Sequence, residues 1–333
     1  MVQQDGNTSV GNNTDHCFTE NPTVYTVLSS AMIMEFILAL PLNLSVLYVF
    51  LFKFKFWKTN SMFLFNMVVA DLLLVGCLPV KAYHYQQGVR RSENKTVCKS
   101  MLFMLFLNRS ASIAFLTMIS IDRYLSVVHP GKKNFLKVLK RSPHTSILIW
   151  VMLLPLTIPT MLKTFECCNS LGREDDGLLD VLTDVVREVV FFTQILIPFG
   201  VLVFCTAQIV NRLKKKTVGD KTKLRRAVFL VSSVVFVFSL CFLPCAISRM
   251  VLLIARIKEN ERAEEIAVQV YDSLMCFSYI DCFLDPLVYC FCCSRFKNIY
   301  MSTCVCPSSQ RLGVPMISSA KTGDSKEQTA ESS

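Results

Sequence analysis

Seven long runs of hydrophobic residues are separated along this chain by shorter polar segments. Each run is at least as long as the roughly 20 apolar residues that an α-helix needs to cross a bilayer. A backbone in lipid must pair its polar groups internally, which favours helices. The sequence therefore predicts an all-α fold, a bundle of seven transmembrane helices. The runs are residues 24–52, 61–83, 99–128, 144–164, 186–210, 227–255 and 266–292.

The polar segments differ in charge. Those after the first, third and fifth runs are basic, at residues 53–58, 132–141 and 212–226. Cytoplasmic connections carry an excess of Lys and Arg, so these three are predicted to lie inside and the amino terminus outside. Much of the net charge of +10 then reports topology, and 52% hydrophobic residues fit a membrane protein. We therefore expect a multi-pass plasma-membrane protein, and no nucleic acid as a partner.

Both ends of the chain are polar. Residues 1–23 are predicted to form an extracellular tail without a cleavable signal peptide, because they contain no apolar core. Residues 24–293 would form the transmembrane domain, and residues 294–306 a short amphipathic helix on the inner membrane surface, with Arg295 toward anionic lipid. Residues 307–333 are rich in Ser, Thr and Lys, which predicts a disordered cytoplasmic tail.

Sequons for N-glycosylation occur on the predicted outer side and inside the hydrophobic runs. Asn7 and Asn12 lie in the tail, and Asn94 lies in the first outer loop. Asn43 and Asn108 also match the motif, but a site within a membrane span cannot be glycosylated. Location therefore leaves the three outer sequons as candidate sites.

Four of the 15 cysteines lie on the predicted outer side. An even number in an oxidising compartment suggests two disulfides. We expect Cys98 to bond one member of the adjacent pair Cys167 and Cys168, and Cys17 to bond the other; which bonds which stays open. No spacing with histidines indicates zinc, and no cofactor is expected.

The third run carries chemistry along a single helix face. Arg109 follows Cys98 by eleven residues, a rise of about 16 Å, and Arg123 follows about 21 Å further on. At 100° per residue all three share roughly one face. An ionisable group at bilayer depth is costly, so it usually faces the protein interior and serves a function. With Asp122 and Tyr124 beside Arg123, this face resembles a signal path across the membrane.

Polar residues also interrupt other runs. Asn43 lies in the first run, Asp71 in the second, and Asp281 and Asp285 in the seventh. Such a cluster can hold a sodium ion with waters and hydroxyls. It can equally form a hydrogen-bonded structural network, and both interpretations stay open. No other metal is expected.

These motifs, in this order, resemble those of rhodopsin-like (class A) G-protein-coupled receptors. The resemblance covers about residues 24–300 and departs from the usual pattern at Phe242, where tryptophan is common, at Leu224 and at Thr206. The motifs are Asn43, Asp71, Cys98, Asp122-Arg123-Tyr124, Trp150, Pro198, Cys241-Phe242-Leu243-Pro244 and Asp285-Pro286-Leu287-Val288-Tyr289.

The resemblance implies a switch. Asp122 would hold Arg123 at rest through a charge-assisted hydrogen bond. An agonist would favour an outward swing of the sixth span about Pro244, after which Arg123 would face a G protein. The other residues assigned to this switch are Tyr124, Phe242, Asp285, Pro286 and Tyr289.

Arg109 indicates the class of ligand. A guanidinium on the inward face of a span, in its outer half, needs a counter-charge, and its fork of donors suits a carboxylate. The alternative is a structural salt bridge to an outer acid such as Glu166 or Asp184. Lys81 and Arg249 are further outward cations; each either binds ligand or extends to the membrane rim.

Residues 105–112, Leu-Phe-Leu-Asn-Arg-Ser-Ala-Ser, resemble the third span of the hydroxycarboxylic acid receptors and of the related oxoeicosanoid receptor. That resemblance implies that Arg109 binds the ligand carboxylate. It also implies contributions from Arg249, from Tyr279 and from a hydroxyl of the second outer loop, for which Ser170 is the candidate. The chain lacks the tryptophan that usually precedes the first outer-loop cysteine.

We therefore predict a G-protein-coupled receptor for a small carboxylate-bearing ligand, either a hydroxycarboxylic acid or an oxidised fatty acid. The resemblance implies an inhibitory heterotrimeric G protein, arrestin and receptor kinases as partners. A receptor for a nucleotide or a peptide is the alternative, and an organic-anion transporter a more distant one, since no internal repeat is found. No enzyme is expected, because no nucleophile or metal set converges at one depth.

Overall fold

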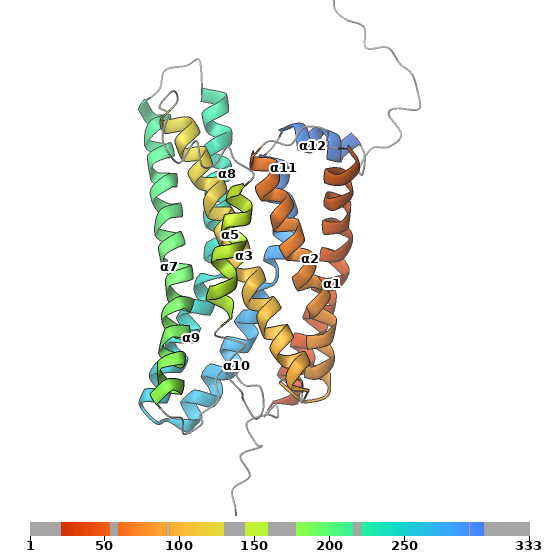
Figure 1. The fold of residues 1–333 in the computed structure, drawn as a ribbon, viewed down its shortest axis with the longest axis vertical. Coiled ribbons are helices and arrows are strands. Elements are labelled where there is room, and N and C mark those ends of the chain that lie inside the picture. Colours follow the sequence, from red (N-terminus) through yellow and green to blue (C-terminus); the bar gives the residue numbers. More distant parts are fainter. Residues whose placement is uncertain are drawn as a thin grey trace, which may run out of the picture.

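The computed structural model describes residues 21–53, 59–90, 92, 94–129, 144–158, 178–215, 221–292 and 294–302, and these form a helical bundle (Figure 1). The predicted all-α fold is confirmed for these residues. The elements are α1 (Pro22–Tyr48), the π-helical turn η2 (Val49–Lys53), α2 (Thr59–Gln86), α3 (Lys95–Val128), α5 (His144–Thr157), α7 (Leu178–Lys215), α8 (Lys221–Cys241), α9 (Leu243–Ile257), α10 (Glu261–Ser278), α11 (Asp281–Cys292) and α12 (Ser294–Tyr300).

Within the described residues, five helical segments are long and apolar enough to cross a membrane. They are Pro22–Lys53, Met62–Gln86, Thr96–Val128, Val181–Lys214 and Ala227–Ile257, and Thr145–Thr157 is a shorter apolar helix. Each matches one of the predicted runs. The seventh run forms two helices, α10 and α11, of which α10 is the more polar.

At the end of the bundle opposite α12, two helices extend further than hydrophobicity predicted. The fifth run was predicted to begin at residue 186, but α7 begins at Leu178. The seventh was predicted to begin at residue 266, but α10 begins at Glu261, where the Asn260 side chain accepts a hydrogen bond from the Ala263 N–H. Hydropathy marks the bilayer rather than the helix ends, because capping side chains satisfy the end of a helix in water.

Pro244 accounts for the break in the sixth span, whereas Pro286 lies inside α11 and leaves one backbone carbonyl of that helix without its usual donor. Phe242 separates α8 from α9, and Pro244 stands in the first turn of α9. Pro286 has no N–H to donate to the Cys282 carbonyl four residues earlier. The Asn43 Nδ2 donates to that carbonyl instead, at 2.9 Å. Asn43 on α1 thereby replaces a hydrogen bond that α11 cannot make for itself.

Helix α3 occupies the centre of the bundle, packed against α2, α5, α7 and α8. Outward-facing positions carry large apolar side chains, including Ile147 and Val151 on α5 and Ile197 and Phe204 on α7. Exposed apolar side chains at these depths are expected where a helix faces lipid rather than water.

Helix α12 lies across one end of the bundle, next to α1 (Figure 1). Phe296 is fully buried and its ring stacks on Phe50 of η2 with centroids 4.8 Å apart. The Tyr300 hydroxyl lies 3.0 Å from the Ser45 Oγ of α1. These contacts fix the helix predicted from residue 294 onward; its place on a membrane surface stays a prediction, as do the tails 1–20 and 303–333, which lie outside the described residues.

Candidate functional site

A cavity opens between α2, α3 and α10, at the opposite end of the bundle from α12. Including its mouth it encloses about 770 Å³. Its wall on α3 is a single helix face that runs from Cys98 through Leu102, Leu105 and Phe106 to Arg109. Arg109 is the last of these residues, about 16 Å along the helix from Cys98, and is therefore the deepest.

The Arg109 guanidinium is buried without a carboxylate. The residue is 8% exposed; its Nη1 lies 3.0 Å from the Met275 Sδ, and its Nη2 donates to the Ser278 Oγ at 3.2 Å. The guanidinium also faces the rings of Phe191 and Phe242, with centroids at 5.8 and 5.5 Å. Sulfur and hydroxyl groups are weak partners for a buried cation. Among the described residues no acid forms an ion pair with it.

The predicted structural alternative finds no support in the described residues. Asp184 forms its ion pair with Arg187, Oδ1 to Nη1 at 3.0 Å, and not with Arg109. Glu166 lies outside the described residues. Arg109 thus keeps donor capacity directed at the cavity.

Lys81 and Tyr279 meet in the same cavity. The Lys81 Nζ donates to the Tyr279 hydroxyl at 2.9 Å and lies over the rings of Tyr85 and Tyr279, 5.3 and 5.0 Å from their centroids. The structure therefore directs Lys81 into the bundle rather than toward the membrane rim. Its role in ligand binding stays a prediction.

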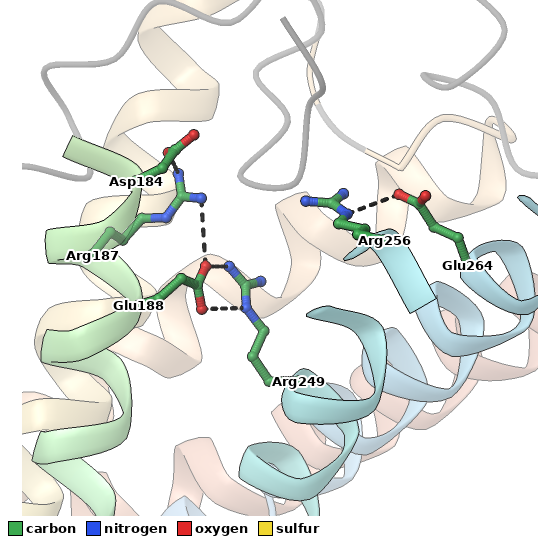
Figure 2. Close-up of polar contacts among 6 residues, drawn as sticks. All are labelled: Asp184, Arg187, Glu188, Arg249, Arg256 and Glu264. Atoms are coloured by element: carbon green, nitrogen blue, oxygen red, sulfur yellow. Dashed lines mark hydrogen bonds and ion pairs between the residues drawn. The ribbon is translucent and has the colours of Figure 1, made fainter. Parts of the chain in front are cut away.

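Arg249 is placed differently from the prediction. It does not line the cavity described above; its guanidinium pairs with Glu188 of α7, the Nε donating to Oε2 at 3.0 Å (Figure 2). The residue is 4% exposed and lies over Tyr271, a cavity residue, at 5.3 Å. Buried charges are normally paired in this way. A direct contact between Arg249 and a ligand stays a prediction.

Figure 2 shows that this pair belongs to an ionic network of Asp184, Arg187, Glu188 and Arg249 that joins α7 to α9, and that a separate pair joins α9 to α10. Arg187 contacts Glu188 at 3.6 Å as well as Asp184, and Arg256 of α9 pairs with Glu264 of α10 at 2.8 Å. These charges explain why α7 and α10 continue beyond the apolar runs. Each charged side chain has a partner on the helix or on its neighbour.

Two acids near the cavity were not singled out from the sequence. Asp272 accepts from Arg90, whose Nε and Nη2 lie at 2.8 and 2.6 Å, and from the Tyr25 hydroxyl at 2.9 Å. Glu35 of α1 has a buried Oε2 without a hydrogen-bond partner and interacts electrostatically with Lys81. An ionisable residue inside a hydrophobic run was the available signal in both cases.

Residues 42–289 match the model of the family described as 7 transmembrane receptor (rhodopsin family). The chain belongs to this family. The match extends from within the first span to within the seventh and confirms the predicted seven-helix bundle, a multi-pass membrane protein. The family consists of receptors coupled to G proteins rather than of enzymes.

Individual relatives of the receptor align over most of their length. The 12-(S)-hydroxy-5,8,10,14-eicosatetraenoic acid receptor of Mus musculus is 33% identical over 291 residues, 86% of this chain and 91% of that one. Hydroxycarboxylic acid receptor 2 of Rattus norvegicus is 32% identical over 306 residues, 90% and 84% of the two chains. Oxoeicosanoid receptor 1 of Homo sapiens is 28% identical over 280 residues, 84% and 73%. The predicted resemblance to this subfamily is confirmed.

The residues assigned to the receptor's switch lie below the cavity. Phe242 is buried, lies under Arg109 and contacts Phe238 with ring centroids 5.1 Å apart. Further in, the Arg123 Nε lies 4.0 Å from the Asp122 Oδ2, the distance of a weak ion pair rather than a hydrogen bond. The Tyr124 hydroxyl lies 3.2 Å from the His129 Nε2. The switch stays a prediction; the Tyr289 side chain lies outside the described residues.

The polar residues of the receptor's spans lie in its interior. Asn43, Asp71 and Asp285 are fully buried and Asp281 nearly so. Both carboxylate oxygens of Asp285 lack a hydrogen-bond partner, and the Asp281 Oδ1 accepts from the Cys282 N–H at 2.8 Å. In the described residues no group of three or more His, Cys, Asp or Glu side chains is arranged to hold a metal ion. A sodium ion at Asp71 and Asp285 stays a prediction, as does the purely hydrogen-bonded network.

Replacing Asn43 with leucine is expected to destabilise the receptor by about 1–3 kcal/mol, because the Cys282 carbonyl freed by Pro286 loses its donor. Tagged receptor heated in detergent and passed over a sizing column would measure this. Thr206→Val is the control, since the Thr206 hydroxyl bonds only within its own helix, to the Leu202 carbonyl. An Asn43→Leu variant as heat-resistant as the control would contradict the bridging role.

The structure describes only part of the surface that was predicted to lie outside the membrane. Cys98 is disulfide-bonded, but its partner lies outside the described residues, as do Cys17, Cys167, Cys168 and Ser170. Asn94 is exposed and caps α3: its Oδ1 accepts from the backbone N–H groups of Thr96 and Val97, which leaves its amide nitrogen outside the cap. Asn7 and Asn12 lie outside the described residues. The glycosylation sites and the disulfide pairing stay predictions.

Proposed function

We propose that the receptor responds to a small carboxylate-bearing ligand, a hydroxycarboxylic acid or an oxidised fatty acid, whose carboxylate binds Arg109. The observation that carries the proposal is a buried guanidinium that lines an open cavity and forms no ion pair with an acid in the part of the chain that the structure describes. Burying a charge without a counter-charge is costly, and a ligand carboxylate would relieve that cost. The names of the relatives, receptors for hydroxy fatty acids and hydroxycarboxylic acids, support the same chemistry.

The signal would pass from Arg109 to Phe242, which its guanidinium faces at 5.5 Å and which stands at the break before α9. A carboxylate that draws Arg109 away from this ring changes the packing at the hinge of the sixth span. The ligand shifts the equilibrium only as far as it binds the active arrangement more tightly. Arg123 would then meet an inhibitory G protein at the plasma membrane, and arrestin and receptor kinases would act on the serine-rich tail.

A panel of acids tested beside their methyl esters checks the proposal. Each ester keeps the shape of its acid and removes the charge, so cells expressing the receptor should respond to acids and not to the matched esters. Inhibition of adenylate cyclase, and its loss after pertussis toxin, would report the inhibitory G protein. The panel contains two groups of acids, short hydroxy acids and long oxidised fatty acids. Esters as potent as their acids would overturn carboxylate recognition.

A further inference from the structure

The cavity contains two cations, Arg109 and Lys81, that form no ion pair with any described acid. The other arginines at this end of the bundle differ from them. The buried Arg90 pairs with Asp272 and the buried Arg249 with Glu188, and the partly exposed Arg256 pairs with Glu264. Since buried charges in proteins are normally paired, two unpaired cations in one open cavity indicate a site that something else neutralises.

The acids around the cavity do not meet this need. Among the described residues that line the cavity, Asp272 is acidic, and its carboxylate already accepts hydrogen bonds from Arg90 and Tyr25. Glu35 interacts electrostatically with Lys81, and Asp281 with Arg109, but neither lines the cavity or lies within ion-pair distance of these cations. They reduce the positive potential and leave the donors of Arg109 and Lys81 available.

The two cations are close together because their hydrogen-bond acceptors are consecutive residues. Arg109 donates to Ser278 and Lys81 donates to Tyr279, the next residue. The Lys81 ammonium has three donors, of which Tyr279 takes one. Apolar lining side chains, among them Leu105, share the same cavity and would contact an aliphatic linker. A ligand with one acidic group would leave one of the two cations unpaired.

We propose that the ligand carries two anionic groups, a dicarboxylic acid in its simplest form, with one carboxylate on Arg109 and the second anion on Lys81. This inference rests on the proposed function and names the substrate class of the same site. The planar fork of Arg109 selects a carboxylate, whereas the ammonium of Lys81 is a point charge that accepts an anion with fewer geometric demands. Lys81 then discriminates between one acid group and two.

Straight-chain α,ω-dicarboxylic acids, from succinic to sebacic acid, test the inference beside their own monomethyl esters. Each ester has nearly the same length and shape but a single charge. In G-protein activation assays the best diacid should be more potent than its monoester by about tenfold or more, the contribution of one charge-assisted hydrogen bond. In Lys81→Met that ratio should fall to about one, and Lys81→Arg should restore much of it.

A ratio within one receptor variant does not depend on its expression level, so a poorly folded variant does not mimic the expected result. Arg256→Gln is the matched control: it removes a cation of the same end of the bundle that is paired and does not line the cavity, and the ratio should persist. Diacids no better than their monoesters, or a ratio that survives in Lys81→Met, would overturn the second anion site and leave the proposed function standing. If acids and esters of both panels act alike, the proposed function fails, and this inference with it.

Discussion

Replacing Arg109 with methionine is expected to abolish the response to carboxylate ligands while leaving the receptor at least as stable as the wild type. The guanidinium would give a carboxylate two charge-assisted hydrogen bonds, so its loss should reduce potency about 100-fold or more. The stability expectation follows from its surroundings, Met275, Ser278 and two aromatic rings, and no described acid, Asp281 included, lies within ion-pair distance of the guanidinium. An apolar side chain of similar length suits that site as well or better.

The two halves of this result distinguish a ligand anchor from a structural residue. Concentration–response curves at matched surface expression give the potency, and heating of solubilised receptor gives the stability. Arg109→Lys keeps the charge but not the planar fork, and an intermediate loss of about tenfold is expected. A methionine variant that loses heat resistance and response together would assign Arg109 to the fold. A variant with unchanged potency would remove it from the site.

The bundle was predictable from the sequence because lipid imposes one requirement on every span. A run of apolar residues long enough to cross must be helical, whatever its neighbours are. The helix ends were less predictable, since they depend on specific partners. Helix α7 begins eight residues before its predicted start, and within that extension Asp184 pairs with Arg187 one turn further along the helix. The polar sequence before residue 186 therefore suggested a loop, although this segment is helical and carries an ion pair.

The candidate site was predictable where it lies on one helix face and not where it joins several helices. The spacing of Cys98 and Arg109 placed both on one face of α3, and both line the cavity. The charge of Lys81 and the family resemblance of Tyr279 marked each residue separately, but their contact across 198 positions was not predicted. The partner of Arg249, Glu188, could not be inferred, since helical periodicity does not determine which of several outer acids a cation reaches. Glu35 carried a signal, an acid inside a span, that was not used.

Replacing Glu188 with glutamine is expected to destabilise the receptor by about 3 kcal/mol, the usual cost of leaving one member of a buried ion pair without its partner. Arg249 is 4% exposed, and Glu188 receives its guanidinium across the α7–α9 interface. Arg187 keeps Asp184 as a partner, so the cost falls mainly on Arg249. Loss of the monodisperse peak after heating in detergent measures it.

Glu264→Gln provides the matched control for this prediction. It breaks the pair with Arg256. The side chains of Arg256 and Glu264 are 24% and 23% exposed, and a pair so open to solvent should contribute less than about 1 kcal/mol. If Glu188→Gln and Glu264→Gln lose equal stability, the α7–α9 pair contributes little, and Arg249 is available to a ligand at small cost.

The double variant Glu188→Leu with Arg249→Met then separates the two roles of Arg249. Removing both charges leaves no unpaired ion, so most of the lost stability should return. Should Arg249 serve only to join α7 to α9, the double variant would regain its response to acids along with its stability. Should Arg249 also bind ligand, stability would return without the response, because the cation would be absent from the stable fold. The interface and the ligand site can thus be assigned independently at a single residue.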